Sequence, residues 1–156
     1  MDWTSPSLIE TKLEAADSTQ VIESLGSLLF DQGFVRDTFI QAVLDREKVF
    51  ATGLPTSEIQ VAIPHADVEH VLRSAIAIGV LSNPVEFGEM GNPDGTVQAS
   101  IVFMLAVKQS DSLVSLLQNL VGIFQDPTIL HQILEAPDRE SIAALISAKL
   151  PDYQEA

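Results

Sequence analysis

The stretch Ser74-Ala75-Ile76-Ala77-Ile78-Gly79-Val80-Leu81, together with the longer apolar stretch from Val97 to Val107, decides the fold. Polar and apolar residues hardly alternate in either stretch, which is typical of strands that are covered on both faces. We therefore predict that both form the centre of a β-sheet. Three shorter segments can extend the sheet: residues 8–13, residues 59–63 and, as a short edge strand inside a loop rich in Gly, Pro, Asn and Asp, residues 85–87.

Helical patterns lie before, between and after these strands. From Ser18 onward, apolar residues recur at spacings of three and four, with Asp17 or Ser18 as N-cap and Gly33 as a left-handed stop. A second helix is predicted from its N-cap Asp37 to about Val49. Three more are predicted after Asp111-Ser112, over residues 126–135 and over residues 138–149.

This order of elements predicts an α/β fold with a mixed, mostly parallel sheet of about five strands, flanked by helices on both faces. The chain has 156 residues, 46% of them hydrophobic, which suffices for one buried core and is too short for two ordinary domains. No internal repeat or low-complexity linker divides the sequence. We expect residues 1–156 to form a single domain.

Composition argues against several classes of function. Eight Lys and Arg against 22 Asp and Glu give a net charge of −14, which repels nucleic-acid phosphates and anionic lipid. No window approaches the ~18 consecutive apolar residues of a membrane span, and the first residues lack the pattern of a secretory signal. We therefore expect a cytoplasmic protein that neither binds nucleic acid nor inserts into a membrane. The absence of cysteine excludes disulfides, zinc-thiolate sites and iron–sulfur clusters.

His65 is the leading candidate for a chemical role. It follows the strand predicted over residues 59–63, with Pro64 restricting the backbone before it and the small Ala66 leaving space beside it. Open-edged sheets place functional groups at strand ends in this way. From position alone, a partly buried structural histidine is an equally good interpretation.

The other two histidines are weaker candidates. His70 follows His65 by five residues, whereas helical histidine ligands of a metal are usually four apart, and no further ligands are evident, so we expect no metal site. Asp67 and Glu69, which lie between the two histidines, are expected on the acidic surface or orienting an imidazole. His131 is expected on the polar side of its helix.

Two further features can bind an anion. Arg46 closes the second helix, and its guanidinium can hold a phosphoryl group through two hydrogen bonds. The alternative is a cation that only stabilises the carboxyl end of the helix. Asp111-Ser112 is interpreted first as an N-cap, with the alternative that its hydroxyl or the backbone amides help to hold an anion.

The run Val61-Ala62-Ile63-Pro64-His65-Ala66 resembles the phosphorylation-site motif of enzyme IIA domains of the bacterial phosphoenolpyruvate-dependent sugar phosphotransferase system, in the fructose–mannitol class. Asp45-Arg46-Glu47 resembles the helix-ending motif whose arginine lines the active centre of that class. The order of the buried strands, the loop between them and the leucine-rich helix is also similar. The resemblance covers residues 8–150.

Departures from the usual pattern resemble the galactitol-type branch of this class. Glu58 stands where most members have a small residue, and the connection from Arg46 to His65 is longer. Ser112 occupies the place of a second active-site histidine in mannitol-type members, and His70 is a candidate to replace that histidine. Other features that resemble this branch are Arg46-Glu47, Phe50, Thr52-Gly53 and the twelve-residue step from Gly53 to His65.

The resemblance implies a phosphoryl carrier without cofactor or metal. Such a domain accepts a phosphoryl group from phosphohistidine on the carrier HPr and passes it to a cysteine of its IIB protein, from which the membrane component IIC phosphorylates sugar. His65 would be phosphorylated at Nε2, with Nδ1–H held by a backbone carbonyl or another acceptor, and Arg46 would stabilise the phosphoryl group. The supporting candidates are Pro64, His70, Asp111 and Ser112, and an apolar collar for docking is expected from Leu54, Ile63 and Val68.

Two alternatives use the same residues differently. A regulatory IIA protein, nitrogen-type or linked to a transcriptional regulator, would use the His65 chemistry for signalling. A non-catalytic binding module would keep His65 as a structural residue. The longer connection between Arg46 and His65 favours the transport branch. The sugar is not legible in this sequence, because the membrane component contacts it.

Overall fold

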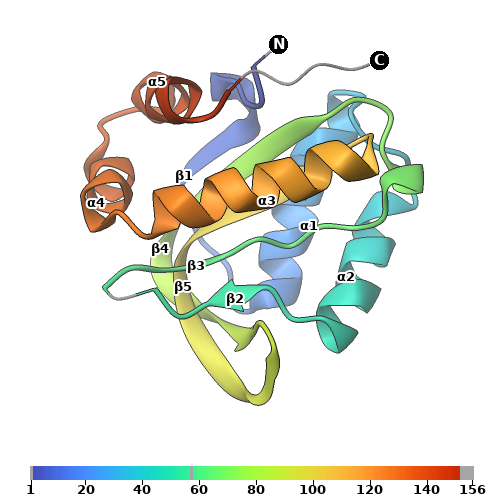
Figure 1. Cartoon of the computed structure of the whole chain (residues 1–156), viewed down its shortest axis with the longest axis horizontal. Coiled ribbons are helices and arrows are strands. Elements are labelled where there is room, and N and C mark those ends of the chain that lie inside the picture. Colours follow the sequence, from blue (N-terminus) through green and yellow to red (C-terminus); the bar gives the residue numbers. More distant parts are fainter. Residues whose placement is uncertain (1, 57, 152–156) are drawn as a thin grey trace.

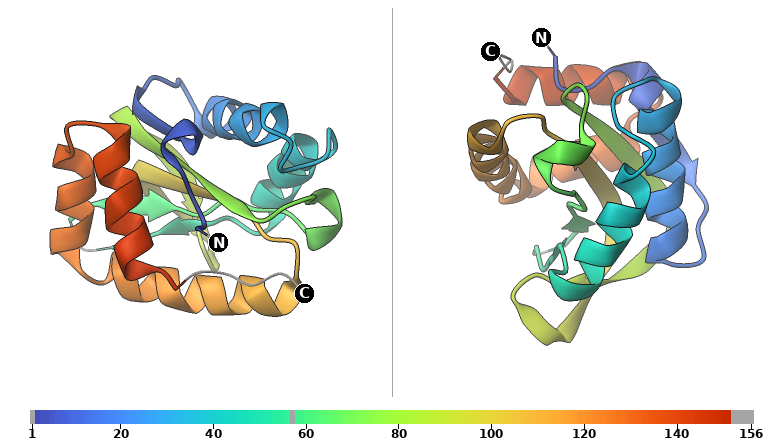
Figure 2. Two further views of the ribbon diagram at one scale, coloured as in Figure 1. Left: turned by 90° about the horizontal axis from the view of Figure 1, so that it is seen from above. Right: turned by 90° about the vertical axis from the view of Figure 1, so that its right-hand side faces the viewer.

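The computed structural model describes residues 2–56 and 58–151, which form a five-stranded sheet with helices on both faces (Figures 1 and 2). The strands are β1 Ile9–Leu13, β2 Gly53–Leu54, β3 Gln60–Ala62, β4 Ala75–Glu89 and β5 Asn92–Ala106. The helices are α1 Ser18–Asp31, α2 Phe39–Val49, α3 Ser110–Phe124, α4 Pro127–Glu135 and α5 Arg139–Lys149, with 3₁₀ turns at Pro6–Leu8 and Val68–His70. The α/β fold predicted from the sequence is confirmed.

The sheet is mixed. β4 is parallel to β1 and antiparallel to β5, and β3 joins β5 in parallel. β2 is antiparallel to β3 and meets the end of β4 through the pair Gly53 and Glu89. A side chain at Gly53 would prevent this approach, because a Cβ there would lie 2.5 Å from the Gly88 carbonyl oxygen. Three pairings are parallel and two antiparallel, but the longest pairing is the antiparallel one between β4 and β5.

Alternating side chains along the central strands enter two separate core layers. On one face, Ile78 and Phe103 pack beneath α3, α4 and α5, and on the other, Ala77 and Met104 pack beneath α1 and α2. Figure 2 shows these two groups of helices on opposite sides of the sheet. Both faces of the central strands are therefore covered, as their lack of alternation predicted. Among the described residues, no single helix is long and apolar enough to span a membrane, and α3 and α4 pass that test only as a pair bent by 86°.

Three predicted helix starts are confirmed. Asp17, Asp126 and Asp138 each accept a hydrogen bond from a backbone N–H two or three residues further on, and α1, α4 and α5 begin directly after them. These bonds satisfy N–H groups that have no partner within the helix. Gly33 follows α1 with a φ of 80°, as expected of a left-handed stop.

Two predicted caps are wrong. Asp37 does not cap α2, which begins at Phe39 after Thr38 without a side-chain cap. A backbone turn serves instead, in which the Phe39 N–H donates to the carbonyl oxygen of Arg36 (3.1 Å). Asp111 and Ser112 do not cap α3 either, because that helix begins at Ser110 and includes both in its first turn.

The segment predicted as a loop with a short edge strand is a continuous hairpin. β4 runs through Pro84 to Glu89, and only Met90 and Gly91 separate it from β5. The register shifts between Val80 and Val85, which marks the irregularity where the sheet tolerates proline. Figure 1 shows the tip of this hairpin extending beyond the helices. Turn-forming residues were misleading here because one face of this part of the hairpin, with Val85, Phe87 and Val97, is buried, while the turn formers lie on the exposed face and at the tip.

Candidate functional site

His65 lies where the chain leaves the sheet after β3. The parallel pairing with β5 continues past Ala62, since the Leu105 N–H donates to the Pro64 carbonyl oxygen (3.0 Å) and His65 forms a bridge with Leu105. Proline has no N–H, so Pro64 acts here only as an acceptor. The structure thus places His65 just past the end of a strand, as the sequence predicts, beside the buried end of β5.

The backbone holds the imidazole ring of His65. Nδ1 lies 2.8 Å from the carbonyl oxygen of Ile63, two residues earlier. Because a carbonyl oxygen only accepts hydrogen bonds, Nδ1 carries the hydrogen and Nε2 of the neutral ring carries the lone pair. The residue is 7% exposed. The surroundings therefore favour one tautomer and one orientation of the ring.

The pKa of His65 lies below its ordinary value, chiefly because burial disfavours the charged imidazolium. The positive charge of Arg46 lowers this pKa further, while the hydrogen bond to Ile63 and the carboxylate of Asp67 raise it. The net effect is a ring that stays neutral near neutral pH. A neutral imidazole with an unprotonated Nε2 is a competent nucleophile.

Arg46 reaches the same region from the last turn of α2. Its Nη1 lies 3.7 Å from Oδ1 of Asp67, and its guanidinium carbon lies 5.2 Å from the centre of the Phe50 ring. The buried Nε has no hydrogen-bond partner among the described residues. The side chain is 35% exposed. The guanidinium is therefore held in place and still has N–H donors available for an anion.

Reasoning from the sequence missed both contacts that hold Arg46. Asp67 lies on the surface, as the sequence predicts, and its carboxylate also faces the arginine. Its position two residues after His65 was the available signal. Phe50 was noted only as part of a resemblance, although a spacing of four residues on a helix places it beside Arg46.

His70 is engaged elsewhere. Its Nδ1 lies 2.8 Å from Oγ1 of Thr38, and its Nε2 lies 3.7 Å from Oε1 of Glu69. Thr38 precedes α2, whereas Arg46 lies in its last turn. The backbone positions of Thr38 and Arg46 are therefore about 12 Å apart along the helix axis. Among the described residues no hydrogen bond or ion pair joins His70 to Arg46 or His65, and a supporting role of His70 stays a prediction.

Asp111 and Ser112 lie in the first turn of α3, which begins five residues after Leu105, the strand neighbour of His65. Neither side chain makes a hydrogen bond or ion pair to His65 or Arg46 within the described ranges. The first turn of α3 has no side-chain cap, so its backbone N–H groups are not occupied by the residue before it. A contribution of these two residues to anion binding stays a prediction.

The third histidine lies apart from this site. His131 on α4 is 2.7 Å from Oε2 of Glu58, and both side chains are about half exposed or more, as expected of a surface histidine. Within the described part of the chain, no group of three or more His, Asp and Glu side chains is placed to hold a metal ion.

The apolar surface near the site differs in part from the predicted collar, of which Leu54 and Val68 are half-buried. Ile63 is 1% exposed and belongs to the core, so it is not available to a partner. Instead Val49 and Phe50, at the end of α2, are 72% and 62% exposed. With Met90 of the hairpin they border a groove of about 630 Å³.

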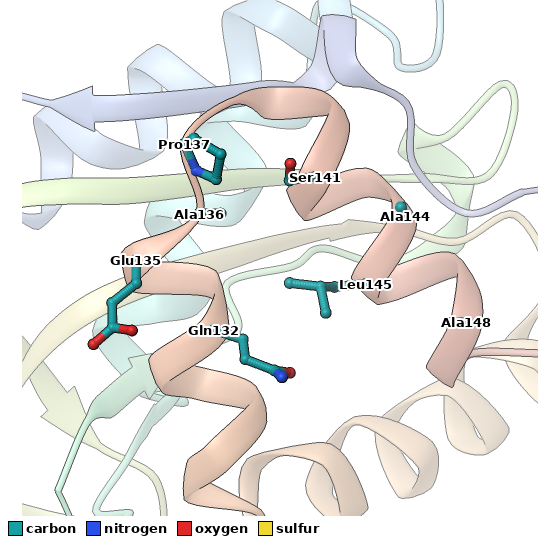
Figure 3. A pocket seen from close by; sticks show the side chains of 8 residues that line it. All are labelled: Gln132, Glu135, Ala136, Pro137, Ser141, Ala144, Leu145 and Ala148. Carbon is teal, nitrogen blue, oxygen red and sulfur yellow. The ribbon is translucent and has the colours of Figure 1, made fainter.

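A different groove, of about 570 Å³, lies between α4 and α5 (Figure 3). It is on the face of the sheet opposite α2. Its lining is formed by Gln132, Glu135, Ala136, Pro137, Ser141, Ala144, Leu145 and Ala148, none of which is a predicted site residue.

The fold and the site together define an α/β protein that presents a neutral histidine at a strand end, next to an arginine. Residues 3–149 match the family model described as the phosphoenolpyruvate-dependent sugar phosphotransferase system, EIIA 2, so the chain belongs to this family of phosphoryl carriers. The resemblance seen in the sequence is thereby confirmed.

Three individual similarities place the chain within this family. It is 30% identical over 132 residues to the galactitol-specific EIIA component of Escherichia coli K12, which covers 85% of this chain and 87% of that protein. It is 35% identical over 133 residues to the transcriptional regulator ManR of Bacillus subtilis, covering 83% of this chain but 19% of the regulator. The mannitol enzyme IIA in its complex with phosphorylated enzyme IIB from Escherichia coli has the same fold, with a TM-score of 0.77 at 24% identity, over 92% of this chain and 96% of that one.

Proposed function

We propose that this chain is the IIA component of a sugar or hexitol phosphotransferase system, which carries the phosphoryl group on Nε2 of His65. The observation that supports this most directly is the 2.8 Å contact between His65 Nδ1 and the Ile63 carbonyl oxygen. That contact leaves Nε2 as the nitrogen with the lone pair. A phosphoryl carrier needs such a nucleophile and requires no strong base beside it.

Two transfers make up the proposed reaction. In the first, the lone pair of His65 Nε2 attacks phosphorus, and the phosphorus–nitrogen bond of phosphohistidine on HPr breaks, returning its electron pair to the donor ring. In the second, a cysteine thiolate of a IIB protein attacks the same phosphorus, and the bond to His65 Nε2 breaks. Throughout, Nδ1 keeps its hydrogen against the Ile63 carbonyl. The protein contributes mainly position and charge to such transfers.

Arg46 would supply the positive charge that stabilises the phosphoryl group during transfer. The phosphoryl group in transfer carries negative charge on its peripheral oxygens, which the guanidinium can bind through two hydrogen bonds. Asp67 and the Phe50 ring hold the guanidinium in place. Pro64 fixes the strand beside His65, and the backbone amides near Asp111 and Ser112 are a further proposed contributor.

A galactitol-like transport system is the assignment favoured within this family. It is supported by the similarity over most of both chains to the galactitol-specific component of Escherichia coli. The partners would be HPr, a cognate IIB protein and, through IIB, the membrane component IIC, with this domain acting in the cytoplasm. No cofactor or metal is required for these steps.

A regulatory role is the second candidate. It is favoured by the 35% identity to a segment of the regulator ManR. The same His65 chemistry would then report the phosphorylation state of HPr to a regulatory partner. Onward transfer distinguishes the two roles, because only a transport component must pass its phosphoryl group to the cysteine of a galactitol-type IIB protein.

The test is the intact mass of the protein after incubation with phosphoenolpyruvate, enzyme I and HPr. We expect the gain of one acid-labile phosphoryl group. His65→Ala should gain none, while His131→Ala, which removes an exposed histidine, should gain one as the unaltered protein does. Failure of the unaltered protein to gain mass while HPr is phosphorylated would reject the carrier function, and a gain by His65→Ala would reject the assigned residue.

A further inference from the structure

Glu47, the residue after Arg46, makes its hydrogen bonds to the start of β2. Its Oε1 accepts from the backbone N–H of Thr52 (2.9 Å), and both carboxylate oxygens lie within 3.0 Å of the Thr52 hydroxyl. Thr52 itself is 2% exposed. Burial raises the pKa of the Glu47 carboxyl, while the Thr52 bonds and Arg46 lower it. A carboxylate taken partly out of water in this way has a structural task, since its desolvation must be offset by those bonds.

From Thr52, a chain of hydrogen bonds leads to the imidazole. The Thr52 carbonyl oxygen accepts from the Ile63 N–H (3.2 Å), which extends the antiparallel pairing of β2 and β3. The carbonyl oxygen of Ile63 then accepts from Nδ1 of His65 (2.8 Å). Figure 1 shows the chain passing from the end of α2 into β2, which lies beside β3. One side chain at the end of α2 thus connects to the peptide unit that orients the ring.

The same carboxylate also connects the two halves of the site. Glu47 is the chain neighbour of Arg46 on the last turn of α2, whereas His65 lies on the segment after β3. Only Phe50 and Ala51 join α2 to Thr52, and neither is buried: Phe50 is exposed and Ala51 is half-buried. The bonds from Glu47 to Thr52 therefore link α2, which carries Arg46, to β2 and β3, which lead to His65.

We propose that Glu47 is a positioning residue for His65: through Thr52 and Ile63 it fixes the Nδ1–H tautomer and the orientation of the imidazole, and it holds Arg46 in register with that ring. Its effect on transfer rests on the proposed phosphoryl-carrier function. Its effect on the tautomer does not, because the tautomer is a property of the unphosphorylated protein.

The test measures the ring nitrogens of His65 by ¹⁵N NMR in the unphosphorylated chain, together with the rate of phosphoryl transfer from phospho-HPr. Glu47→Ala breaks the connection and Thr52→Val removes its hydroxyl bonds, whereas Glu47→Gln and Thr52→Ser retain an acceptor and a hydroxyl. Asp45→Ala is the matched control, since Asp45 lies on the same helix and bonds only to the side chain of Gln41 among the described residues. Thermal unfolding of each variant monitors the fold.

We expect the unaltered protein, Asp45→Ala and Thr52→Ser to keep the Nδ1–H tautomer. Glu47→Ala should show a mixture of tautomers and transfer about tenfold more slowly, within the range that a misplaced reacting group costs. Thr52→Val should change in the same direction by less, because the Thr52 N–H still reaches Glu47. Glu47→Gln should restore most of the loss.

An unchanged tautomer in both Glu47→Ala and Thr52→Val overturns the proposal, whatever happens to the rate. If Glu47→Ala does not fold, the comparison of Thr52→Val with Thr52→Ser decides in the same way. If the tautomer changes while no form of the protein accepts a phosphoryl group, the carrier function fails and the positioning role of Glu47 stands.

Discussion

At the scale of the residue, Arg46 is held by contacts that are individually weak. A 3.7 Å ion pair to a well exposed Asp67 and an exposed ring at 5.2 Å contribute little to folding. Arg46→Ala should therefore change the free energy of unfolding by less than about 1 kcal/mol. The rate of phosphoryl transfer from phospho-HPr should fall about 100-fold, because the transition state loses its charged donor. Rapid-quench kinetics and urea unfolding measure the two effects.

Two further variants give this prediction its controls. Arg46→Lys keeps the charge but not the forked donor geometry, so an intermediate rate is expected. Lys48→Ala removes an exposed cation two residues further along α2 and should transfer as the unaltered protein does. Equal rates for Arg46→Ala and Lys48→Ala would remove Arg46 from the site.

The lowered pKa of His65 predicts a specific dependence of stability on pH. In the unfolded chain the imidazole titrates near its ordinary value of about 6.5, whereas the folded ring resists protonation. Above about pH 6.5 the His65 imidazole is neutral in both the folded and the unfolded state, and the folded state keeps its full stability. As the pH falls from there toward the lower pKa of the folded ring, the unfolded state binds more protons, and stability is lost.

His65→Gln should remove this part of the loss. Urea unfolding between about pH 7.5 and pH 5 should therefore show a shallower decline for His65→Gln than for the unaltered protein. The comparison of the two proteins cancels the titration of other groups, including the carboxyl of Glu47. Parallel curves would mean that burial does not lower the pKa of His65.

Single residues were predictable where local sequence determines them. Pro64 ends a strand and the next residue is a histidine, so the place of His65 at a sheet edge follows from the order of residues. The bonds between Glu47 and Thr52 depend on how the turn after α2 folds back, and the contact between Arg46 and Asp67 depends on how α2 packs against the loop after β3. The position of Asp67 two residues after His65 indicates that it lies near the site, but no spacing in the sequence encodes either arrangement in full.

At the scale of the element, two aspartates of similar sequence context differ in their effect on helix starts. Asp17 accepts from the Gln20 N–H (2.9 Å), whereas Asp37 makes no cap for α2. Asp17→Ala should lower the free energy of unfolding by about 1 kcal/mol, the usual cost of losing an N-cap. Asp37→Ala should leave it nearly unchanged. Thermal or urea unfolding measures the two variants side by side. A greater loss of stability in Asp37→Ala than in Asp17→Ala would contradict the assignment of the caps.

The hairpin of β4 and β5 explains why one element was predicted with wrong bounds. Its inner half lies in the core and has the apolar pattern of a central strand. Its outer half buries Val85, Phe87 and Val97 on one face, is exposed on the other and is rich in Gly, Pro and Asn. Composition therefore changes in the middle of a continuous strand. Hydrogen bonding between the two strands, which local composition does not report, keeps the outer half extended.

At the scale of the whole molecule, the segment around His65 is anchored in both core layers. Val61 and Ile63 enter the layer beneath α3, α4 and α5, while Ala62 and Ala66 enter the layer beneath α1 and α2. The histidine is therefore held by the packing of the entire sheet and not by one helix. Under the proposed function His65 meets two different partners in the same geometry, and this anchoring would suit that role.

The net charge of −14 acts at this same scale and gives the last prediction. A partner that presents a basic surface is attracted over a distance set by salt screening, about 10 Å at 0.1 M ionic strength. The second-order rate constant for transfer from phospho-HPr should therefore fall several-fold as salt rises from about 0.02 M to 0.5 M. The first-order rate within the saturated complex should change little, because Arg46 and His65 act at short range there. Stopped-flow kinetics at several concentrations of HPr separate the two constants, with sucrose in place of salt as the control. A second-order constant indifferent to salt would mean that the acidic surface does not steer the partner, and apolar contacts such as those of Phe50 would then have to supply the encounter.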